Sequence, residues 1–373
     1  MSELEWIENE ATQTASWRSE SATRAPRRVV LADDTTRADD AYRLACEGTA
    51  LLSRGDFHNA RQLLTALARR IDRKPAKPSS GDPATDFHRH RAAQNHRARI
   101  LGMLLVPLDA DGAVPLRRAP DVRSAVAQSY GALDTKTVVA LRELLGVVGA
   151  SEWRRTGVAV PALGGGRIHP HYGVFSPARG EYLDLVAREP LPDTPVAFDI
   201  GTGTGVLAAV LARRGVERVI ATDQDPRALA SATENLTRLG FAERVEVIEA
   251  DLYPSGRAGL IVCNPPWLPA KPTSPIEFAV YDPNSRMLTG FLGGLAEHLD
   301  DGGEGWLIIS DIAEHLGLRA RDDLLAMVAA AGLIVLGRSD IAPKHRKARD
   351  AGDPLHAARA AEITSLWRLG VAP

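Results

Sequence analysis

A short glycine-rich turn, Asp199-Ile200-Gly201-Thr202-Gly203-Thr204-Gly205, constrains the fold of this 373-residue chain more than any other feature. The apolar run Val196–Phe198 leads into the turn, and the apolar segment Val206–Leu211 follows it. This order predicts a strand, a tight loop and a helix. Glycine lets the backbone turn sharply and lets a ligand come close, and the free N–H groups at the start of the helix would face that ligand.

Apolar runs of strand length recur after this turn, and helical patterns separate them. One such helix is predicted to begin with Asp225 as its N-cap and Pro226 as its first residue. The alternation predicts an α/β fold with a Rossmann-like, doubly wound, mostly parallel sheet of about seven strands, which binds ligands at the carboxyl ends of its strands. The predicted strands are Val196–Ile200, Val219–Thr222, Val245–Glu249, Leu260–Cys263, Trp306–Ser310, Leu333–Arg338 and Thr364–Leu369.

The first 150 residues have another pattern. Residues 1–36 are polar and lack sustained periodicity, which predicts a disordered leader. Residues 37–150 carry helical patterns and are predicted to form a mainly helical N-terminal domain, either for substrate recognition or as a stabilising cap. The helices are predicted at about 38–52, 56–71, 92–106, 122–130 and 136–148, with a linker at 74–83.

A loop-rich connecting segment is predicted over residues 151–180, ahead of the sheet-containing domain at 181–373. Its stretch His169–Pro177 is either a wall of an active site or a plain connector. The sequence does not decide between these two roles.

Composition excludes several classes of protein. A formal net charge of −2 gives no global attraction to nucleic acid or to anionic membranes. Cys46 and Cys263 cannot form a zinc cluster by themselves and are predicted to be reduced core thiols. No apolar run approaches the length of a membrane span, and the first residues do not resemble a secretory signal. The sequence therefore predicts a cytoplasmic protein without a membrane partner or a metal.

The motif Asn264-Pro265-Pro266-Trp267 follows the predicted strand Leu260–Cys263. Two prolines remove two N–H groups and fix φ, so this corner is predicted to project the Asn264 side chain and nearby carbonyl oxygens into a pocket. The oxygens of Asn264 and Pro265 can accept both hydrogens of a planar NH₂ group. Such a nitrogen is a poor nucleophile because its lone pair is delocalised, and this arrangement would favour its attack on an electrophile. Trp267 would supply a stacking surface.

Together with Asp223 and Asp251, which follow the next two strands, these motifs resemble those of class I S-adenosylmethionine-dependent methyltransferases. The resemblance covers about residues 165–370. It is strongest to the subgroup with an Asn-Pro-Pro-aromatic motif, which includes the HemK-type release-factor glutamine methyltransferases of the methyltransferase small domain group and the adenine-N6 methyltransferases.

The resemblance implies S-adenosylmethionine as the cofactor. The glycine turn would hold its methionine part, Asp223 its ribose hydroxyls and Asp251 its adenine. Without the other motifs, both acids would be interpreted as solvated turn residues. The implied cofactor-binding residues are Asp199, Gly201, Thr202, Gly203, Gly205, Asp223, Asp251 and Asn264. The implied catalytic residues are Asn264, Pro265, Pro266 and Trp267.

The function implied by the resemblance is methylation of a planar NH₂ nitrogen, first of all that of a protein glutamine in a release factor or ribosomal protein. Trp267 stands where the subgroup more often has Tyr or Phe, and Gly173–Pro177 is similar to the ribosomal RNA guanine methyltransferases. Methylation of an RNA or DNA base, at adenine N6 or guanine N2, therefore stays open. A cofactor-binding interaction protein without turnover is a further alternative, although the intact Asn264 argues against it. A nicotinamide oxidoreductase is disfavoured because the Asn-Pro-Pro-Trp motif has no role in hydride transfer.

Two basic segments also stand out. Residues Phe87–Arg99 contain three histidines and four arginines without an acid, and Lys344–Arg349 is a second basic run. Each either binds RNA or an acidic ribosomal surface, or is a solvated face.

Overall fold

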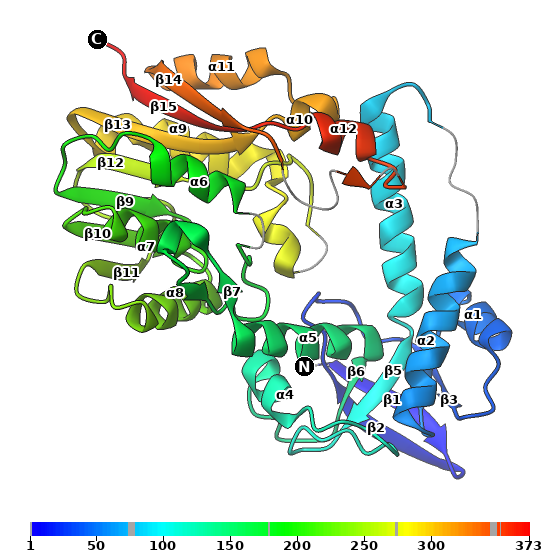
Figure 1. Ribbon diagram of the computed structural model, residues 1–373. Coiled ribbons are helices and arrows are strands. Elements are labelled where there is room, and N and C mark those ends of the chain that lie inside the picture. The colour runs from blue at the N-terminus through cyan, green and yellow to red at the C-terminus, as the bar shows by residue number, and fades with distance from the viewer. Residues whose placement is uncertain (1, 74–78, 178–179, 273–274, 344–348, 351) are drawn as a thin grey trace. The chain divides into compact units, whose positions relative to one another are not determined.

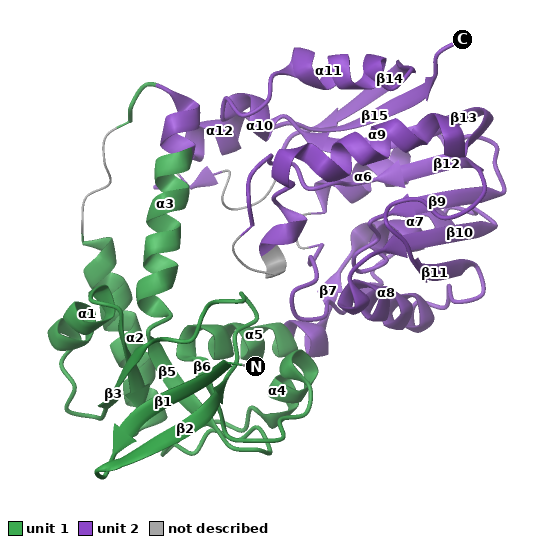
Figure 2. Cartoon of the chain, turned by 180° about the vertical axis from the view of Figure 1, so that it is seen from behind, with its two compact units in different colours: residues 1–81, 88–152 green, residues 82–87, 153–373 purple. Residues whose placement is uncertain are grey.

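The computed structural model describes residues 2–73, 79–177, 180–272, 275–343, 349–350 and 352–373 (Figure 1). Residues 74–78 of the predicted linker and 344–348 of the second basic run lie outside the described residues. The chain divides into two compact units, coloured separately in Figure 2. Unit 1 comprises residues 1–81 and 88–152, and unit 2 comprises residues 82–87 and 153–373. No helix in the described part of the chain is long and apolar enough to cross a membrane.

Unit 2 is built on a seven-stranded sheet with the order β11-β10-β9-β12-β13-β15-β14. Every strand except β15 runs in the same direction, and β15 lies antiparallel between β13 and β14. All seven strands predicted from the sequence are present, so the predicted mostly parallel, Rossmann-like sheet is confirmed. The strands are β9 (Val196–Ile200), β10 (Arg218–Asp223), β11 (Val245–Glu249), β12 (Ala258–Cys263), β13 (Leu299–Ser310), β14 (Leu333–Ile341) and β15 (Thr364–Val371).

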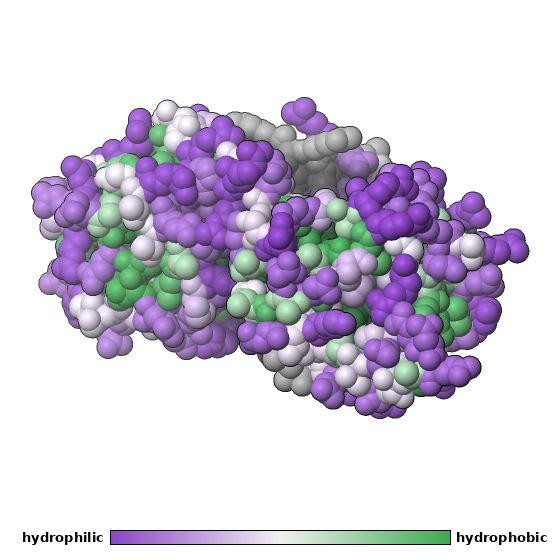
Figure 3. Space-filling view, turned by 90° about the horizontal axis from the view of Figure 1, so that it is seen from below, coloured by the Kyte–Doolittle hydropathy of each residue, from purple (hydrophilic) through white to green (hydrophobic). Residues whose placement is uncertain are grey.

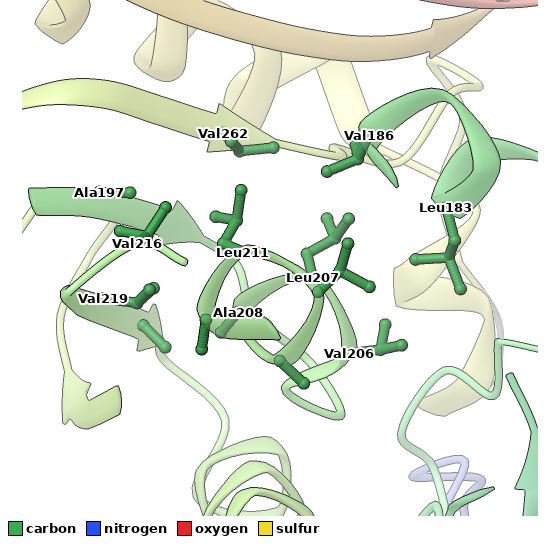
Figure 4. Packing of buried hydrophobic residues seen from close by; sticks show 14 of the residues in the cluster. Leu183, Val186, Ala197, Val206, Leu207, Ala208, Leu211, Val216, Val219 and Val262 are labelled. Carbon is green, nitrogen blue, oxygen red and sulfur yellow. The ribbon is translucent and has the colours of Figure 1, made fainter. Parts of the chain in front are cut away.

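Helices cover both faces of this sheet because successive strand residues point to opposite sides. Ala197 and Val262 face one side and pack with residues of α6 (Glu181–Arg188), α7 (Val206–Arg213) and α8 (Pro226–Arg238), as Figure 4 shows in part. Phe198 and Ile261 face the other side and pack with α9 (Arg286–His298) and α11 (Arg321–Ala330). Burying one Val or Ile side chain contributes about 1.5–3 kcal/mol, so the two clusters stabilise the sheet beneath the strand ends.

Shorter elements complete unit 2. They are the antiparallel pair β7 (Val158–Ala159) and β8 (Arg167–Ile168), the helices α10 (Ile312–His315) and α12 (His356–Ala361), and the 3₁₀ turns η1 (Pro161–Leu163), η2 (Pro275–Ala279) and η3 (Pro283–Ser285).

On the face drawn in Figure 3, hydrophilic residues predominate and hydrophobic residues gather in small patches.

Unit 1 contains a six-stranded mixed sheet with the order β1-β2-β6-β5-β4-β3. Its strands are β1 (Ser2–Glu8), β2 (Ala11–Trp17), β3 (Arg28–Ala32), β4 (Thr49–Ser53), β5 (Leu104–Leu108) and β6 (Thr137–Ala140). The helices are α1 (Ala38–Cys46), α2 (Phe57–Asp72), α3 (Pro83–Leu101), α4 (Arg123–Tyr130) and α5 (Leu141–Thr156). The first residues of α3 and the last residues of α5, from Trp153 on, belong to unit 2, and the rest of both helices belongs to unit 1.

The predicted disordered leader at residues 1–36 is wrong, because this segment forms β1, β2 and β3. Leu4 and Trp6 of β1 are buried at alternate positions and pack with Ala15 and Trp17 of β2. This alternation is the period of a half-buried strand. The polar residues between the apolar ones face away from the core, which explains why the composition suggested disorder.

Residues 37–150 are mainly helical, as predicted, but the sequence missed the three strands β4, β5 and β6 that lie among the helices and belong to the sheet of unit 1. Leu51 and Leu52 lie in β4, where the sequence predicted the end of a long helix. α1 stops at Cys46, and Gly48 with φ +83° turns the chain into the strand. By contrast, the predicted helix that begins after Asp56 is confirmed, since the Asp56 carboxylate accepts the His58 N–H. Cys263 is buried as predicted, whereas Cys46 is exposed.

Candidate functional site

A cavity of about 880 Å³ lies at the carboxyl ends of β9, β10 and β12 in unit 2. This volume falls in the range of small-molecule and cofactor sites. The sequence-predicted residues that line it are Gly201, Thr202, Gly203, Asp223, Asn264, Pro265, Pro266 and Trp267. The other predicted site residues, Asp199, Gly205 and Asp251, are not part of the lining.

Asp199 is fully buried at the end of β9. Its Oδ2 accepts hydrogen bonds from Thr202 Oγ1 at 2.6 Å and from the Ala208 N–H at 3.0 Å, while its Oδ1 has no hydrogen-bond partner among the described residues. Burial raises the pKa of this carboxyl to about 6. Asp199 therefore ties the glycine turn to the first turn of α7 from beneath the cavity.

The glycines of the turn have different roles. Gly203 has φ +56°, and a Cβ built there would meet no heavy atom within 4 Å, so its backbone borders open space. Gly205 has φ +78°, and a Cβ there would lie 3.1 Å from Ala232 Cα in α8. A side chain at Gly205 would thus force α7 and α8 apart. Gly205 was predicted to hold the cofactor, but the structure places it at the contact between the two helices.

Asp223 ends β10 and faces the cavity. Its Oδ2 accepts the Gly203 N–H and its Oδ1 accepts the Asp225 N–H, both at 3.0 Å. Each carboxylate oxygen can accept a second hydrogen bond. Burial raises the pKa of this carboxyl, against the effect of the backbone hydrogen bonds. The side chain joins two neighbouring strand ends and still presents acceptors.

Asp251 does not reach the cavity. Its exposed carboxylate accepts hydrogen bonds from Gln224 Nε2 at 2.7 Å and from Arg286 Nη2 at 2.8 Å. Gln224 and Arg286 both line the cavity, and their hydrogen bonds hold the Asp251 carboxylate outside it. The sequence assigned Asp251 to the adenine, whereas the wall beside it is formed by its neighbours Ala250 and Leu252.

Leu252 has an unusual backbone conformation, with φ +74°. Residues with a Cβ rarely adopt this conformation, and they tend to do so at functional sites. The Leu252 carbonyl accepts the Thr222 hydroxyl at 2.6 Å. This bond helps to hold Leu252 in place as an apolar part of the cavity wall.

The Asn-Pro-Pro-Trp corner follows the fully buried strand β12, as predicted. Trp267 Nε1 donates a hydrogen bond to Asn264 Oδ1 over 3.0 Å. The indole N–H therefore uses one acceptor position of the carboxamide oxygen and leaves a second one. This bond was not predicted from the sequence, although a tryptophan at the aromatic position brings an N–H that Phe and Tyr lack on the ring.

The segment after the corner forms a second wall, which the sequence did not predict. The Leu268 N–H donates to the Val280 carbonyl, and the Asp282 N–H donates to the Leu268 carbonyl. The Asp282 carboxylate in turn accepts the N–H groups of Met287 and Leu288 at the start of α9. Asp282 stands ahead of the helix α9, and such an acid can be recognised in a sequence as a possible helix cap. No motif, however, identified residues 277–287 as part of a site.

The stretch His169–Pro177 contributes a wall through Gly173, Val174 and Phe175, in favour of the first of its two predicted roles. Helix α8 holds His169 and His171, which lie just before this wall. His171 Nε2 lies 2.9 Å from Glu234 Oε2, and the Asn235 side chain accepts the His169 N–H. Within the described residues, no group of three or more His, Cys, Asp or Glu side chains is arranged to hold a metal ion.

Unit 2 combines a mostly parallel sheet with a glycine turn, a strand-end acid and an Asn-Pro-Pro-aromatic corner on one cavity, an arrangement similar to that of Rossmann-like methyltransferase domains. Residues 166–320 match the family model described as "Methyltransferase small domain". The resemblance to S-adenosylmethionine-dependent methyltransferases that the sequence predicted is thereby confirmed for this part of the chain.

Similar proteins with assigned names share parts of this region. A ribosomal protein L11 methyltransferase of Pelotomaculum thermopropionicum is 46% identical over 69 residues, which are 18% of this chain and 22% of the relative. A release factor glutamine methyltransferase of Cereibacter sphaeroides is 36% identical over 146 residues, covering 38% of this chain and 49% of the relative. A tRNA1(Val) (adenine(37)-N6)-methyltransferase of Bacteroides fragilis is 40% identical over 89 residues, covering 22% of this chain and 38% of the relative. The chain spans about half the length of these relatives or less.

Proposed function

We propose that unit 2 is an S-adenosylmethionine-dependent N-methyltransferase that acts on a planar NH₂ nitrogen of a macromolecule. The observation that carries the proposal is a single cavity lined by the glycine turn, Asp223 and the Asn264–Trp267 corner. One part of this cavity suits a nucleoside-like cofactor, and another presents acceptors for NH₂ hydrogens.

The residues present fit the cofactor. When bound, S-adenosylmethionine supplies a methyl group on an electrophilic sulfonium. The open space at Gly203 admits a ligand close to the backbone. The remaining acceptor positions of Asp223 suit the two hydroxyls of a ribose. Leu252 and Met287 offer an apolar wall to a planar ring, in place of the contact predicted for Asp251.

Asn264 holds the acceptor nitrogen in this proposal. The second acceptor position on Asn264 Oδ1 and the Pro265 carbonyl take the two hydrogens of the NH₂ group, which favours charge developing on the nitrogen. The bond from Trp267 fixes the direction of the carboxamide before the substrate arrives. No general base is required, because the methylated nitrogen can lose its proton to water.

A protein glutamine is the first candidate acceptor, because a release factor glutamine methyltransferase matches this chain over 146 residues. An RNA or DNA base is the second, favoured by Phe278, whose side chain lines the cavity and is 65% exposed. An exposed aromatic ring can stack on an unpaired base. We place the activity in the cytoplasm, with a translation protein or RNA as partner.

The proposal is tested by incubating the protein with methyl-labelled cofactor and a cell lysate, followed by separate nuclease and protease digestion. Release of label by protease indicates a protein acceptor, and release by nuclease indicates a nucleic acid. We expect Asn264→Ala to lower methyl transfer about a hundredfold or more while cofactor affinity changes only a few-fold. Gln128→Ala, on the exposed surface of α4, is the control. Unchanged transfer by the Asn264 variant would contradict the mechanism.

A further inference from the structure

The segment from the end of α2 through α3 is strongly basic. Residues 69–99 contain nine Lys and Arg residues against three Asp, a formal charge of +6 in a chain whose total is −2. Charge concentrated in this way is typical of segments that bind polyanions. Residues 74–78 of this stretch lie outside the described residues, and four of its arginines, Arg89, Arg91, Arg97 and Arg99, lie on α3.

One face of α3 gathers basic side chains. His88, Arg89, His96 and Arg99 are exposed, and their spacing places them on one side of the helix. At a rise of about 1.5 Å per residue they extend along about 17 Å, long enough to contact several nucleotides. Arg97, which lies on another side, pairs with Asp72 of α2 at 2.9 Å. This ion pair ties the helix to α2 and leaves the exposed face turned outward.

The same helix is anchored at the cavity wall of unit 2. Phe87 is 1% exposed and packs in one cluster with Leu268 and Ile312, both of which line the cavity. Leu268 directly follows Trp267 of the proposed catalytic corner. The basic residues therefore begin one position beyond a side chain that is buried against this wall.

We propose that this face of α3, defined by His88, Arg89, His96 and Arg99, binds the phosphate backbone of a nucleic acid. Guanidinium groups match phosphate oxygens in a bidentate way. The centre of a protein interface is usually apolar or aromatic, whereas the face offers no large apolar side chain beside these four. The inference rests on the proposed function in one respect, namely that a nucleic acid is one of its two candidate acceptors.

The test is the binding of a fluorescein-labelled 20-nucleotide RNA, and of DNA with the same sequence, to the full chain without cofactor. We expect Arg89→Gln combined with Arg99→Gln to weaken binding about tenfold or more. Loss of two phosphate contacts should also flatten the dependence of log K on log salt by about 1.4. The control, Arg218→Gln combined with Arg257→Gln, removes two exposed charges elsewhere and should leave affinity and slope unchanged.

Binding of either nucleic acid that is weakened in the Arg89 and Arg99 double variant but not in the control supports the proposal, and a preference for RNA or for DNA identifies the source of the phosphates. Absence of binding, or an equal loss in both double variants, overturns it. Equal competition by polyglutamate would also overturn it, because the face would then bind acidic chains in general. These measurements need no turnover, so their failure is separable from failure of methyl transfer in the Asn264 experiment.

Discussion

The two units of this chain use strand-end acids in opposite ways. In unit 1, Asp34 and Asp56 follow the parallel strands β3 and β4 beside a hollow of about 40 Å³. Asp34 accepts the Asp56 N–H at 2.8 Å and Arg117 Nη2 at 2.5 Å, and Asp56 accepts Arg118 Nε at 2.6 Å. In unit 2, Asp223 ends β10 beside a cavity of about 880 Å³ and accepts backbone N–H groups.

The difference shows that parallel strands with acids at their ends do not by themselves make a binding site. In unit 1 the acceptors are used by side chains and backbone within the unit, and the hydrogen bond from the Asp56 backbone lowers the pKa of Asp34. In unit 2 burial raises the pKa of Asp223, and part of its acceptor capacity stays directed to the cavity. We infer that a ligand site requires strand-end acids that keep unused hydrogen-bond acceptor positions and direct them towards open space.

The largest effect is expected for stability at Asp199. Its pKa of about 6 lies above the ordinary 3.8, so the stability it contributes is present below pH 3.8 and is lost as the pH rises through 6. The difference corresponds to about 3 kcal/mol. Asp199→Asn should therefore raise the free energy of unfolding in urea at pH 8 by up to this amount, with little change at pH 4.

Asp34→Asn is the matched variant in unit 1 and should behave in the opposite way. Because the pKa of Asp34 is lowered, its contribution is present above its unfolded pKa and is lost as the pH falls. The variant should lose stability at pH 8. The same sign of change in both variants would contradict the comparison between the units.

A second effect concerns cofactor affinity. Asp223→Asn removes the charged acceptor proposed for the ribose hydroxyls, and hydrogen bonds to charged groups contribute about 1.5–3 kcal/mol. Calorimetric titration with S-adenosylmethionine should show about a hundredfold weaker binding. Asp34→Asn should bind as tightly as the unaltered chain at a pH where both are folded. Equal losses in the two variants would mean that the cavity of unit 2 is not the site.

A smaller effect separates the two glycines. A residue with a Cβ at positive φ costs about 1–2 kcal/mol. Gly205→Ala adds the close approach to Ala232 Cα, so thermal unfolding should show a free energy of unfolding that is lower by at least about 2 kcal/mol. Gly203→Ala should cost about 1 kcal/mol and weaken cofactor binding more than Gly205→Ala does. The reverse order would show that Gly203 does not border the ligand.

The smallest effect is expected for Trp267→Phe, which keeps an aromatic ring and removes the indole N–H. Loss of one neutral hydrogen bond costs about 0.5–1.5 kcal/mol, so kcat should fall about two- to tenfold with an unchanged cofactor affinity. A change confined to the substrate KM would show that Trp267 contacts the acceptor but does not position Asn264.

The sequence predicted the sheet of unit 2 because its strands contain short apolar runs, most of which are followed by a glycine or an acid. In unit 1 the residues that end the strands were harder to identify from the sequence. Leu51 and Leu52 continue the apolar face of α1, so only the turn at Gly48 separates a helix from a strand there. The alternation of Leu4 and Trp6 carried a strand signal that their polar neighbours masked.

For the site, local motifs located the glycine turn, Asp223 and the Asn264 corner. They could not locate contacts that depend on distant residues. Asp251 is held outside the cavity by Arg286, which lies 35 positions further along the chain. The bond from Trp267 to Asn264 depends on side-chain geometry, and the wall around Asp282 forms through pairing with Leu268.

The central claim is that the glycine turn, Asp223 and the Asn264 corner form one cofactor site. Hydrogen–deuterium exchange with and without S-adenosylmethionine tests it most directly. We predict slower exchange in peptides that cover residues 200–208, 223–228 and 262–268, and no change in residues 28–60. Protection confined to unit 1, or unchanged exchange at all three segments of unit 2 under saturating cofactor, would contradict the claim.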